Sequence, residues 1–210
     1  MPKYNTSRLV ALTFDDGPAQ TTVPIIEALK ANGAVATFFV SGDQLRRHTD
    51  VTEYAVRIGC EIGNHSHEHN DLTQLDYDGV LKQIEYNNEL MISVTGKRPT
   101  IMRPPYGYYN DTVKRAARAC GLALINWSVD PKDWDTDNAF MTRKRILSEL
   151  EDGSVIVCHD SMASTATLMA RFIPELKLIG YQLVTVSQLF EANNVKLVPG
   201  ALYLSPNEVY

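Results

Sequence analysis

The sequence predicts an α/β fold in which helices cover a parallel sheet. Seven short apolar segments have the composition of buried strands, and a segment with apolar residues at helical spacing follows each of them. Clusters of glycine, asparagine and proline separate these segments. Because parallel strands need long crossover connections, this alternation indicates either a closed barrel or an open, doubly wound sheet.

The composition is that of an ordinary globular protein. Of the 210 residues, 44% are hydrophobic and 21% are charged, so we expect residues 1–210 to form one domain around one sizeable core. The formal net charge of -5 gives no electrostatic reason to bind nucleic acid and is compatible with a neutral substrate. No apolar run approaches the roughly 18 residues of a membrane span, and residues 1–8 lack the apolar segment of a signal peptide.

The three cysteines are too few and too widely spaced for a disulfide framework or a thiolate metal site. We expect Cys60, Cys120 and Cys158 to be small buried side chains, with a single disulfide as the alternative. If Cys158 lies on a strand, the alternation of side chains points it away from its neighbour His159.

The predicted strands are apolar runs that lie between turn residues. The first covers residues 9–14 and ends at two aspartates before a Gly-Pro turn. Being continuously apolar, these runs fit strands that are buried on both faces. The later ones cover residues 35–40, 60–63, 100–103, 122–127, 154–158 and 182–186.

A predicted helix follows each strand. The first begins at Thr21 or Thr22 and ends at Asn32-Gly33, a typical stop signal. The others cover residues 42–59, 76–94, 110–120, 138–151, 166–179 and 187–192. We expect the tail, residues 195–210, to wrap the surface because it holds two prolines and no clear helical period.

Unusual polar side chains lie just past the carboxyl ends of five predicted strands. In a parallel α/β fold these ends share one face, which is where such folds place their sites. The sequence therefore predicts that the five segments meet at one pocket. In chain order they carry Asp15 and Asp16; His65 and His69; Arg103; Asp130, Asp133 and Trp134; and His159 and Asp160.

Two adjacent carboxylates at the end of a buried strand require a partner. Asp15 and Asp16 cost free energy there unless a cation, an arginine or a shared proton neutralises them. If residues 64–69 turn helical, His65 and His69 share one face at i and i+4, while His67 points elsewhere. Two imidazoles and one carboxylate form an open site that suits Zn²⁺ or a similar ion. The alternatives are a solvated polar turn and two aspartates that cap the next helix.

Five motifs resemble, in order, those of the polysaccharide deacetylase domain, also called the NodB homology domain or carbohydrate esterase family 4. The resemblance spans residues 9 to about 190. It implies a distorted (β/α) barrel, often with seven parallel strands and with helices outside, and the metal-dependent removal of acetyl groups from sugar polymers. The motifs are Thr13–Pro18, His65-Ser66-x-x-His69, Arg103-Pro104-Pro105-Tyr106, Asp130-x-x-Asp133-Trp134 and Val157-Cys158-His159.

The resemblance also implies roles for the residues around the expected cation. Asp16, His65 and His69 match the metal ligands, and Asp15 matches the general base. Arg103 matches the residue that pairs with this base, since a nearby guanidinium keeps a carboxylate ionised. A surface arginine packed over Tyr106 is the alternative. The backbone N–H of Tyr106 matches the donor that, with the metal, stabilises the oxyanion.

The last two motifs supply the acid and the pocket for the acetyl group. His159 matches the general acid, and Asp133 matches the carboxylate that orients it and raises its pKa. Trp134 and Val157 would line the acetyl pocket, although both could be plain core residues. The family usually has leucine where this chain has Val157, so the preference for acyl size is expected to shift. Asp130 either positions its neighbours or caps a turn.

The implied activity is removal of N-acetyl groups from N-acetylglucosamine units of a polymer such as peptidoglycan or chitin. One divalent ion is expected, Zn²⁺ first, with Co²⁺ or a similar ion as the alternative. The expected partner is an acetylated polysaccharide, the expected assembly a monomer, and the expected location secreted or cell-wall associated. An acetylxylan esterase that uses the same site is the rival enzyme, and a non-catalytic carbohydrate-binding module is the rival of another class.

Overall fold

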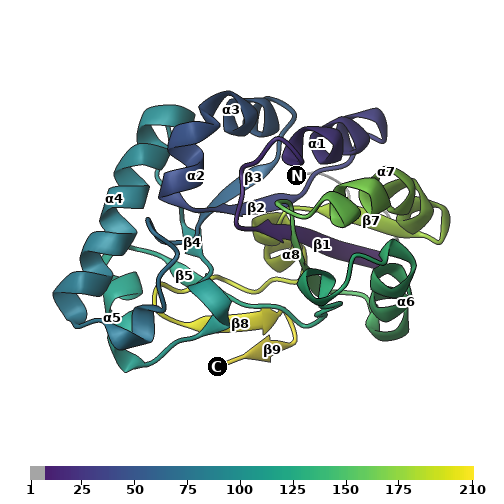
Figure 1. Cartoon of the computed structure of the whole chain (residues 1–210). Coiled ribbons are helices and arrows are strands. Elements are labelled where there is room, and N and C mark those ends of the chain that lie inside the picture. Colours follow the sequence, from purple (N-terminus) through teal and green to yellow (C-terminus); the bar gives the residue numbers. More distant parts are fainter. Residues whose placement is uncertain (1–7) are drawn as a thin grey trace.

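Strand β1 (Arg8–Asp15) has neighbouring strands along both of its edges (Figure 1). Along one edge it pairs in parallel with β6 (Ser154–His159), and along the other edge with β2 (Thr37–Val40) and β7 (Tyr181–Val184). The last two strands share that edge because β7 pairs with the beginning of β1 and β2 with its end. This computed structural model of the chain describes residues 8–210.

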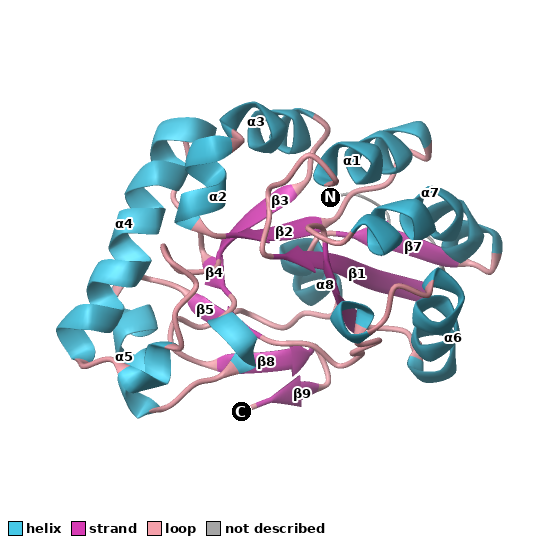
Figure 2. Ribbon diagram, in the orientation of Figure 1, coloured by secondary structure: helices cyan, strands magenta, loops and turns pink. Residues whose placement is uncertain are grey.

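The sheet curves into a nearly closed barrel. From β2 it continues in parallel through β3 (Glu61–Asn64), β4 (Ile101–Met102) and β5 (Ala123–Ile125). An isolated parallel bridge between Val129 and Ile156 joins the chain after β5 to β6. Strands β1–β7 thus form a distorted barrel with helices around it (Figure 2). The predicted (β/α) barrel is confirmed, and the open-sheet alternative is wrong.

The tail does not merely wrap the surface, as the sequence analysis expected. It adds β8 (Leu202–Ser205), which pairs in parallel with β5, and β9 (Glu208–Val209), which pairs antiparallel with β8. Leu202 and Tyr203 are buried. Because an uncovered edge of β5 would leave backbone groups unpaired, β8 satisfies them and extends the sheet.

The helices follow the strands in the predicted order. One correction concerns residues 42–59, where the chain forms two helices rather than one, because His48 has a non-helical backbone (φ -134°, ψ 46°). Helix starts at Asp76, Asn110, Asn138 and Thr185 carry side chains that accept backbone N–H bonds. The helices are α1 (Thr22–Ala31), α2 (Gly42–Arg47), α3 (Thr49–Arg57), α4 (Tyr77–Thr95), α5 (Asp111–Ala119), α6 (Ala139–Glu149), α7 (Ala163–Leu178) and α8 (Val186–Ala192).

Alternate residues of β1 face two different cores. Val10, Leu12 and Phe14 pack against helices α1 and α7. By contrast, Leu9 and Ala11 belong to a second cluster that also gathers residues of β2, β4, β5, β6 and β7. Because strand side chains alternate, Thr13 and Asp15 continue this second face toward the barrel interior. The strand that builds the core therefore also delivers a carboxylate to the mouth of the barrel.

The three cysteines are free and buried, so the prediction of small buried side chains is confirmed. Cys158 belongs to the core cluster between the sheet and the outer helices, on the side of β6 opposite to His159, as strand alternation predicts. Within residues 8–210, no helix combines the length and the apolar character that crossing a membrane requires.

The position of β8 in the sheet leads to a stability prediction. Leu202 is 1% exposed, so Leu202→Ala is expected to lower the free energy of unfolding by about 2–5 kcal/mol through lost burial and a cavity. The matched control is Leu178→Ala on α7, where the side chain is 87% exposed and the change should stay below about 0.5 kcal/mol. Urea denaturation measures both, and equal effects would contradict the structural role of the tail.

Candidate active site

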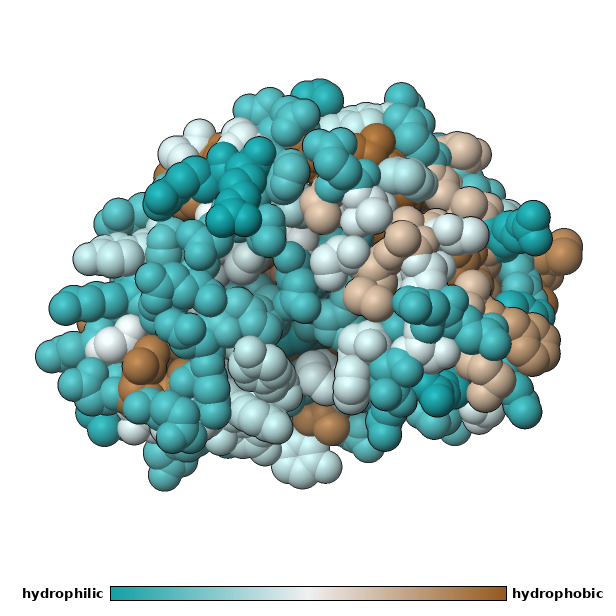
Figure 3. Space-filling view, viewed as in Figure 1, coloured by the Kyte–Doolittle hydropathy of each residue, from teal (hydrophilic) through white to brown (hydrophobic). Residues whose placement is uncertain are grey.

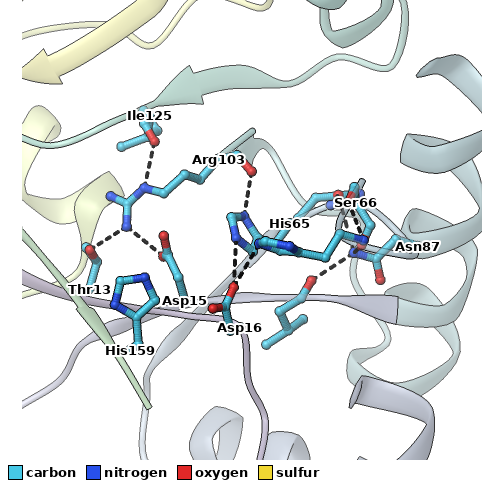
Figure 4. A network of polar contacts seen from close by, with 12 residues as sticks. Thr13, Asp15, Asp16, His65, Ser66, Asn87, Arg103, Ile125 and His159 are labelled. Atoms are coloured by element: carbon cyan, nitrogen blue, oxygen red, sulfur yellow. Dashed lines mark hydrogen bonds and ion pairs between the residues drawn. The ribbon is translucent and has the colours of Figure 1, made fainter. Parts of the chain in front are cut away.

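Asp16, His65 and His69 converge at the carboxyl ends of β1 and β3. Asp16 Oδ1 lies 2.9 Å from His69 Nε2 and 3.4 Å from His65 Nε2. One ligand atom from each residue can be chosen so that all three lie within 4.8 Å of one another. Figure 4 shows His65 beside Asp16, with its other ring nitrogen turned toward Arg103. The predicted juxtaposition of these three residues is thus present in the structure.

The loop that carries the two histidines is not helical, so the helical arrangement considered from the sequence does not form. It turns at Ser66 and again at His69, both of which have positive φ angles (62° and 58°). Asn87 on α4 donates hydrogen bonds to Ser66 O and Val40 O, at 2.9 Å each, and Ser66 Oγ accepts a bond from His69 N. These bonds hold both imidazoles on one side of the loop without a helix.

The donor set fits a divalent cation. Asp16 Oδ1 is buried without a well-formed hydrogen bond, although two imidazole nitrogens face it. His65 Nδ1 lies 2.7 Å from Arg103 O, so it donates its proton there and leaves the Nε2 lone pair free for a metal. Burial opposes the charge of Asp16, but the two histidines outweigh it and hold the pKa of Asp16 well below its usual range.

Asp15 has a different partner. Arg103 Nη1 donates to Asp15 Oδ1 at 2.7 Å, and the same nitrogen lies 2.7 Å from Thr13 Oγ1. Carbonyl groups at the carboxyl end of β5 fix the rest of the guanidinium: Nε donates to Ile125 O at 2.9 Å and Nη2 to Asn126 O at 2.8 Å. Arg103 is fully buried, so the alternative of a surface arginine is wrong.

His159 pairs with the buried carboxylate of Asp133. His159 Nδ1 lies 2.7 Å from Asp133 Oδ1, and the backbone N–H of His159 donates to Oδ2 at 2.8 Å. Thr165 on α7 donates a further bond to Oδ2 at 2.6 Å. Burial lowers the pKa of His159, but the bond and charge of Asp133, with Asp15 and Asp16 nearby, outweigh it and raise that pKa to about 9.

A cavity of about 490 Å³ joins these groups. Eight of the ten predicted site residues line it; Arg103 and Asp133, which do not, contact Asp15 and His159. Val157 is almost fully buried at the cavity wall, whereas Trp134 is exposed. On the face shown in Figure 3, mainly hydrophilic residues surround a hollow near the centre. The five segments predicted to meet at one pocket do meet there.

Aromatic side chains form the rim of the cavity. The ring of Tyr106 lies 4.8 Å from that of His69, in an edge-to-face arrangement, and 5.7 Å from that of Tyr108. Tyr106, Tyr108 and Trp134 are each 57% exposed, so their faces are available to a ligand. Sequence reasoning missed Tyr108 and also Trp127, although the clustered aromatic residues at 106–109 were a usable signal.

Strained backbone positions gather in the loops around the site. Six described residues other than glycine have positive φ angles, and five of them lie in these loops: Asp16, Ser66, His69, Tyr106 and Lys132. Each such position costs on the order of 1 kcal/mol or more, and it persists only where surrounding contacts hold it. The clustering indicates that these backbone conformations orient the side chains of the loops toward the site.

Several positioning residues escaped the sequence analysis. The hydroxyl group of Thr13 holds Arg103, and that of Thr165 holds Asp133. Thr13 begins the first motif but was given no role, and nothing in the sequence distinguishes Thr165 from other threonines. Asn87 had a signal, because it lies with Asn88 on the buried face of α4, where apolar residues are expected. The open question on Asp130 is settled in part: its Oδ1 accepts a bond from Lys132 N, which stabilises a turn, and it also lines the cavity.

A cation site at the carboxyl ends of barrel strands, with a carboxylate–arginine pair and a histidine–carboxylate pair beside it, is typical of metal-dependent hydrolases. Comparison with known proteins identifies the family of the chain. Residues 3–125 match the family described as polysaccharide deacetylase. The chain belongs to this family, which is carbohydrate esterase family 4.

Peptidoglycan deacetylases are among the similar curated proteins. The chain is 39% identical over 196 residues to the peptidoglycan-N-acetylmuramic acid deacetylase PdaC of Bacillus subtilis, and the match covers 91% of this chain and 41% of PdaC. It is 32% identical over 191 residues to a peptidoglycan-N-acetylglucosamine deacetylase of Bacillus cereus, and the match covers 88% of this chain and 89% of that relative. The chain thus spans about two fifths of PdaC and nearly all of the shorter relative.

Solved structures of the family have the same fold. The structure of B. subtilis PdaC matches with a TM-score of 0.86 at 37% identity and covers 90% of this chain and 93% of that one. A family 4 acetyl xylan esterase from Clostridium thermocellum, in complex with a cobalt ion, matches with a TM-score of 0.87 at 29% identity. This match covers 94% of this chain and 98% of the esterase chain.

The raised pKa of His159 can be tested in the metal-free protein. His159 should titrate by NMR near pH 9, and Asp133→Asn should bring its pKa down toward that of an ordinary histidine, because the favourable charge is lost. The pKa of His159 is higher in the folded protein than in the unfolded chain. The stabilisation that its pairing with Asp133 contributes is therefore fully present below about pH 6.5 and is lost as the pH rises through about 9.

The control for this titration is Asp135→Asn, an exposed carboxylate two residues from Asp133, which should leave the pKa of His159 unchanged. A pKa of His159 that does not move in Asp133→Asn would show that the pairing does not govern its protonation.

Proposed function

We propose that this chain is a metal-dependent deacetylase that removes N-acetyl groups from N-acetylglucosamine units of a cell-wall polysaccharide. The observation that carries the proposal is the convergence of Asp16, His65 and His69 at the wall of a cavity that Asp15 and His159 also line. Cation ligands, a base and an acid within one cavity are the groups that hydrolysis of an amide requires.

The proposed metal ligands are Asp16, His65 and His69, and the proposed ion is Zn²⁺. A divalent cation at this position would supply Lewis-acid polarisation of the acetyl carbonyl and would lower the pKa of a nearby water. Two neutral imidazoles and one carboxylate match the ligand preference of Zn²⁺ in hydrolases, and they also suit Co²⁺.

Asp15 is the proposed general base. Arg103 donates to its Oδ1 and orients the carboxylate, while the side chain still lines the cavity. In this role Asp15 accepts a proton from the water that attacks the acetyl carbon. The backbone N–H of Tyr106, in the turn that follows Pro105, is the proposed donor to the oxyanion that forms as the carbonyl is attacked.

His159 is the proposed general acid, positioned by Asp133. With its pKa raised to about 9, it carries a proton at neutral pH and can donate it to the sugar nitrogen as the carbon–nitrogen bond breaks. An amine leaves only when its nitrogen is protonated, whereas the alkoxide of an ester is a better leaving group. A well-protonated acid therefore favours N-acetyl over O-acetyl substrates.

A neutral sugar suits the cavity better than an acidic one. Among the described residues that line the cavity, three are aspartates and none is lysine or arginine. The exposed rings of Tyr106, Tyr108 and Trp134 offer apolar faces on which sugar rings can stack. These features support N-acetylglucosamine over N-acetylmuramic acid, which carries an additional carboxyl group. The peptidoglycan deacetylases among the relatives support the cell wall as the place of action.

Acetylxylan esterase is the second candidate function. The structural similarity to the Clostridium thermocellum esterase favours it, because the same groups can cleave an ester. A non-catalytic carbohydrate-binding module is disfavoured by the complete set of cation ligands together with Asp15 and His159.

The test of the proposed function is acetate release by the purified chain. With Zn²⁺ we expect faster release from N-acetylglucosamine oligomers than from acetylated xylan, and loss of activity on addition of EDTA. Asp15→Asn should lower kcat at least 100-fold, within the range for loss of a general base, with Asp43→Asn on α2 as the control. Activity that survives EDTA or Asp15→Asn would contradict the mechanism, and faster release from xylan would favour the esterase.

The wall residue Val157 leads to a prediction on acyl size. Valine leaves room for about one methylene more than leucine would, a difference of roughly 1 kcal/mol. Val157→Leu is therefore expected to shift the ratio of kcat/KM for N-acetyl over N-propionyl oligomers about fivefold in favour of N-acetyl. The same ratio is measured for Val155→Leu, whose parent side chain lies in the barrel core and does not line the cavity. An unchanged ratio in Val157→Leu would show that the acyl group does not contact this residue.

A further inference from the structure

Asp160 is fully buried directly after the proposed acid His159, and the proposed reaction does not use it. We infer that Asp160 is a positioning residue that fixes the loop carrying Asp16, and through that loop the affinity of the cation site. The inference rests on the proposed function only in that Asp16 is a metal ligand; it does not depend on which acetylated polymer is the substrate.

Hydrogen bonds join Asp160 to the far end of the loop after β1. Thr22 Oγ1 donates to Asp160 Oδ2 at 2.6 Å and accepts a bond from Ala19 N at 2.8 Å. Thr21 Oγ1 donates to the backbone carbonyl of Asp160 at 2.5 Å. Asp160, directly after β6, therefore anchors the segment that connects Asp16 to α1.

The carboxyl group of Asp160 also packs against the backbone next to Asp16. A Cβ atom at Gly17 would lie 2.1 Å from Asp160 Oδ2 and 2.3 Å from Oδ1, closer than any real contact allows. Gly17 is thus required by this close approach rather than by its own backbone angles. Because Asp16 precedes it with a φ angle of 69°, the packing of Asp160 on Gly17 helps to hold this left-handed turn.

Burial of the Asp160 carboxyl group costs free energy. Asp160 Oδ1 is buried without a hydrogen bond, and burial, which favours the neutral form, raises the pKa of Asp160 to about 7. A smaller apolar side chain would avoid this cost but would give neither the acceptor for Thr22 nor the packing on Gly17. The placement is therefore better explained by its effect on the loop than by stability.

The geometry also couples two parts of the site. Asp160 is bonded to His159 through the chain and contacts Gly17, the residue bonded to Asp16. Groups behind metal ligands typically change metal affinity by 10–100-fold when they are removed. Asp160 acts one step further back, on the backbone of the ligand rather than on its carboxylate.

The experiment measures Zn²⁺ affinity of the whole chain by competition with a chromophoric chelator, together with thermal unfolding of the metal-free protein. Asp160→Ala is expected to weaken Zn²⁺ binding at least tenfold, and Thr22→Val should act in the same direction. Asp160→Asn keeps an acceptor for Thr22, so it should bind Zn²⁺ more tightly than Asp160→Ala. If Asp160→Ala does not fold, Asp160→Asn and Thr22→Val still test the inference.

A double-mutant cycle tests the contact itself. Gly17→Ala should weaken Zn²⁺ binding because the new methyl group displaces the carboxyl group of Asp160. In the Asp160→Ala background the methyl group has room, so the same substitution should cost clearly less. Additive effects of the two substitutions would overturn the inference.

The matched control is Glu61, a carboxylate bonded to Thr37 and Ser187 at the amino ends of β2 and β3, away from the cation site. Glu61→Gln should lower the unfolding temperature and leave Zn²⁺ affinity unchanged. Equal loss of affinity in Glu61→Gln and Asp160→Ala, or unchanged affinity in folded Asp160 variants, would overturn the inference. Because the readout is metal affinity, absence of deacetylation would contradict the proposed function alone.

Discussion

The buried ion pair between Arg103 and Asp15 is the interaction on which the rest of the site depends. Strand β1 ends in two adjacent carboxylates at the mouth of an apolar barrel, where an unpaired charge costs several kcal/mol. Arg103 partners Asp15 from inside the barrel, where backbone carbonyls at the carboxyl end of β5 hold the guanidinium. Asp16 is thereby left to the two histidines. Because Asp15 pairs with an arginine and Asp16 faces two histidines, the two neighbouring carboxylates can take different roles, as the proposed base and the proposed metal ligand.

Separating the two carboxylates requires a backbone that ordinary residues avoid. Asp15 follows the alternation of β1 into the barrel, whereas Asp16 leaves the strand in a left-handed conformation that turns its side chain toward β3. Such a turn persists only because neighbouring elements hold it. Asn87 supports the histidine loop from α4, and Asp160 contacts the aspartate loop from β6. The site is thus braced by polar contacts that lie outside its own reacting groups.

Local patterns predicted the alternation of strands and helices and most of the site, whereas the closed barrel was implied by the family resemblance alone. Apolar runs mark the strands, and polar residues past the carboxyl ends of parallel strands share one face, which predicts that Arg103 and His159 belong to one site. The break at His48, the non-helical histidine loop and the edge strand β8 depend on tertiary hydrogen bonds instead. The hydroxyls of Thr13 and Thr165 likewise acquire their partners only in the folded chain.

The register between β1 and β6 sets the relation between the proposed base and acid. Asp15 is paired directly with His159 across these parallel strands, and a slip by one residue would turn His159 toward the outer helices and Cys158 toward the cavity. Backbone hydrogen bonds in the core therefore fix the base and the acid relative to each other. The aromatic rim comes from the loops after β4 and β5 rather than from β1 or β6. Variation of these loops can thus change the sugar that is accepted while the reacting groups stay in place.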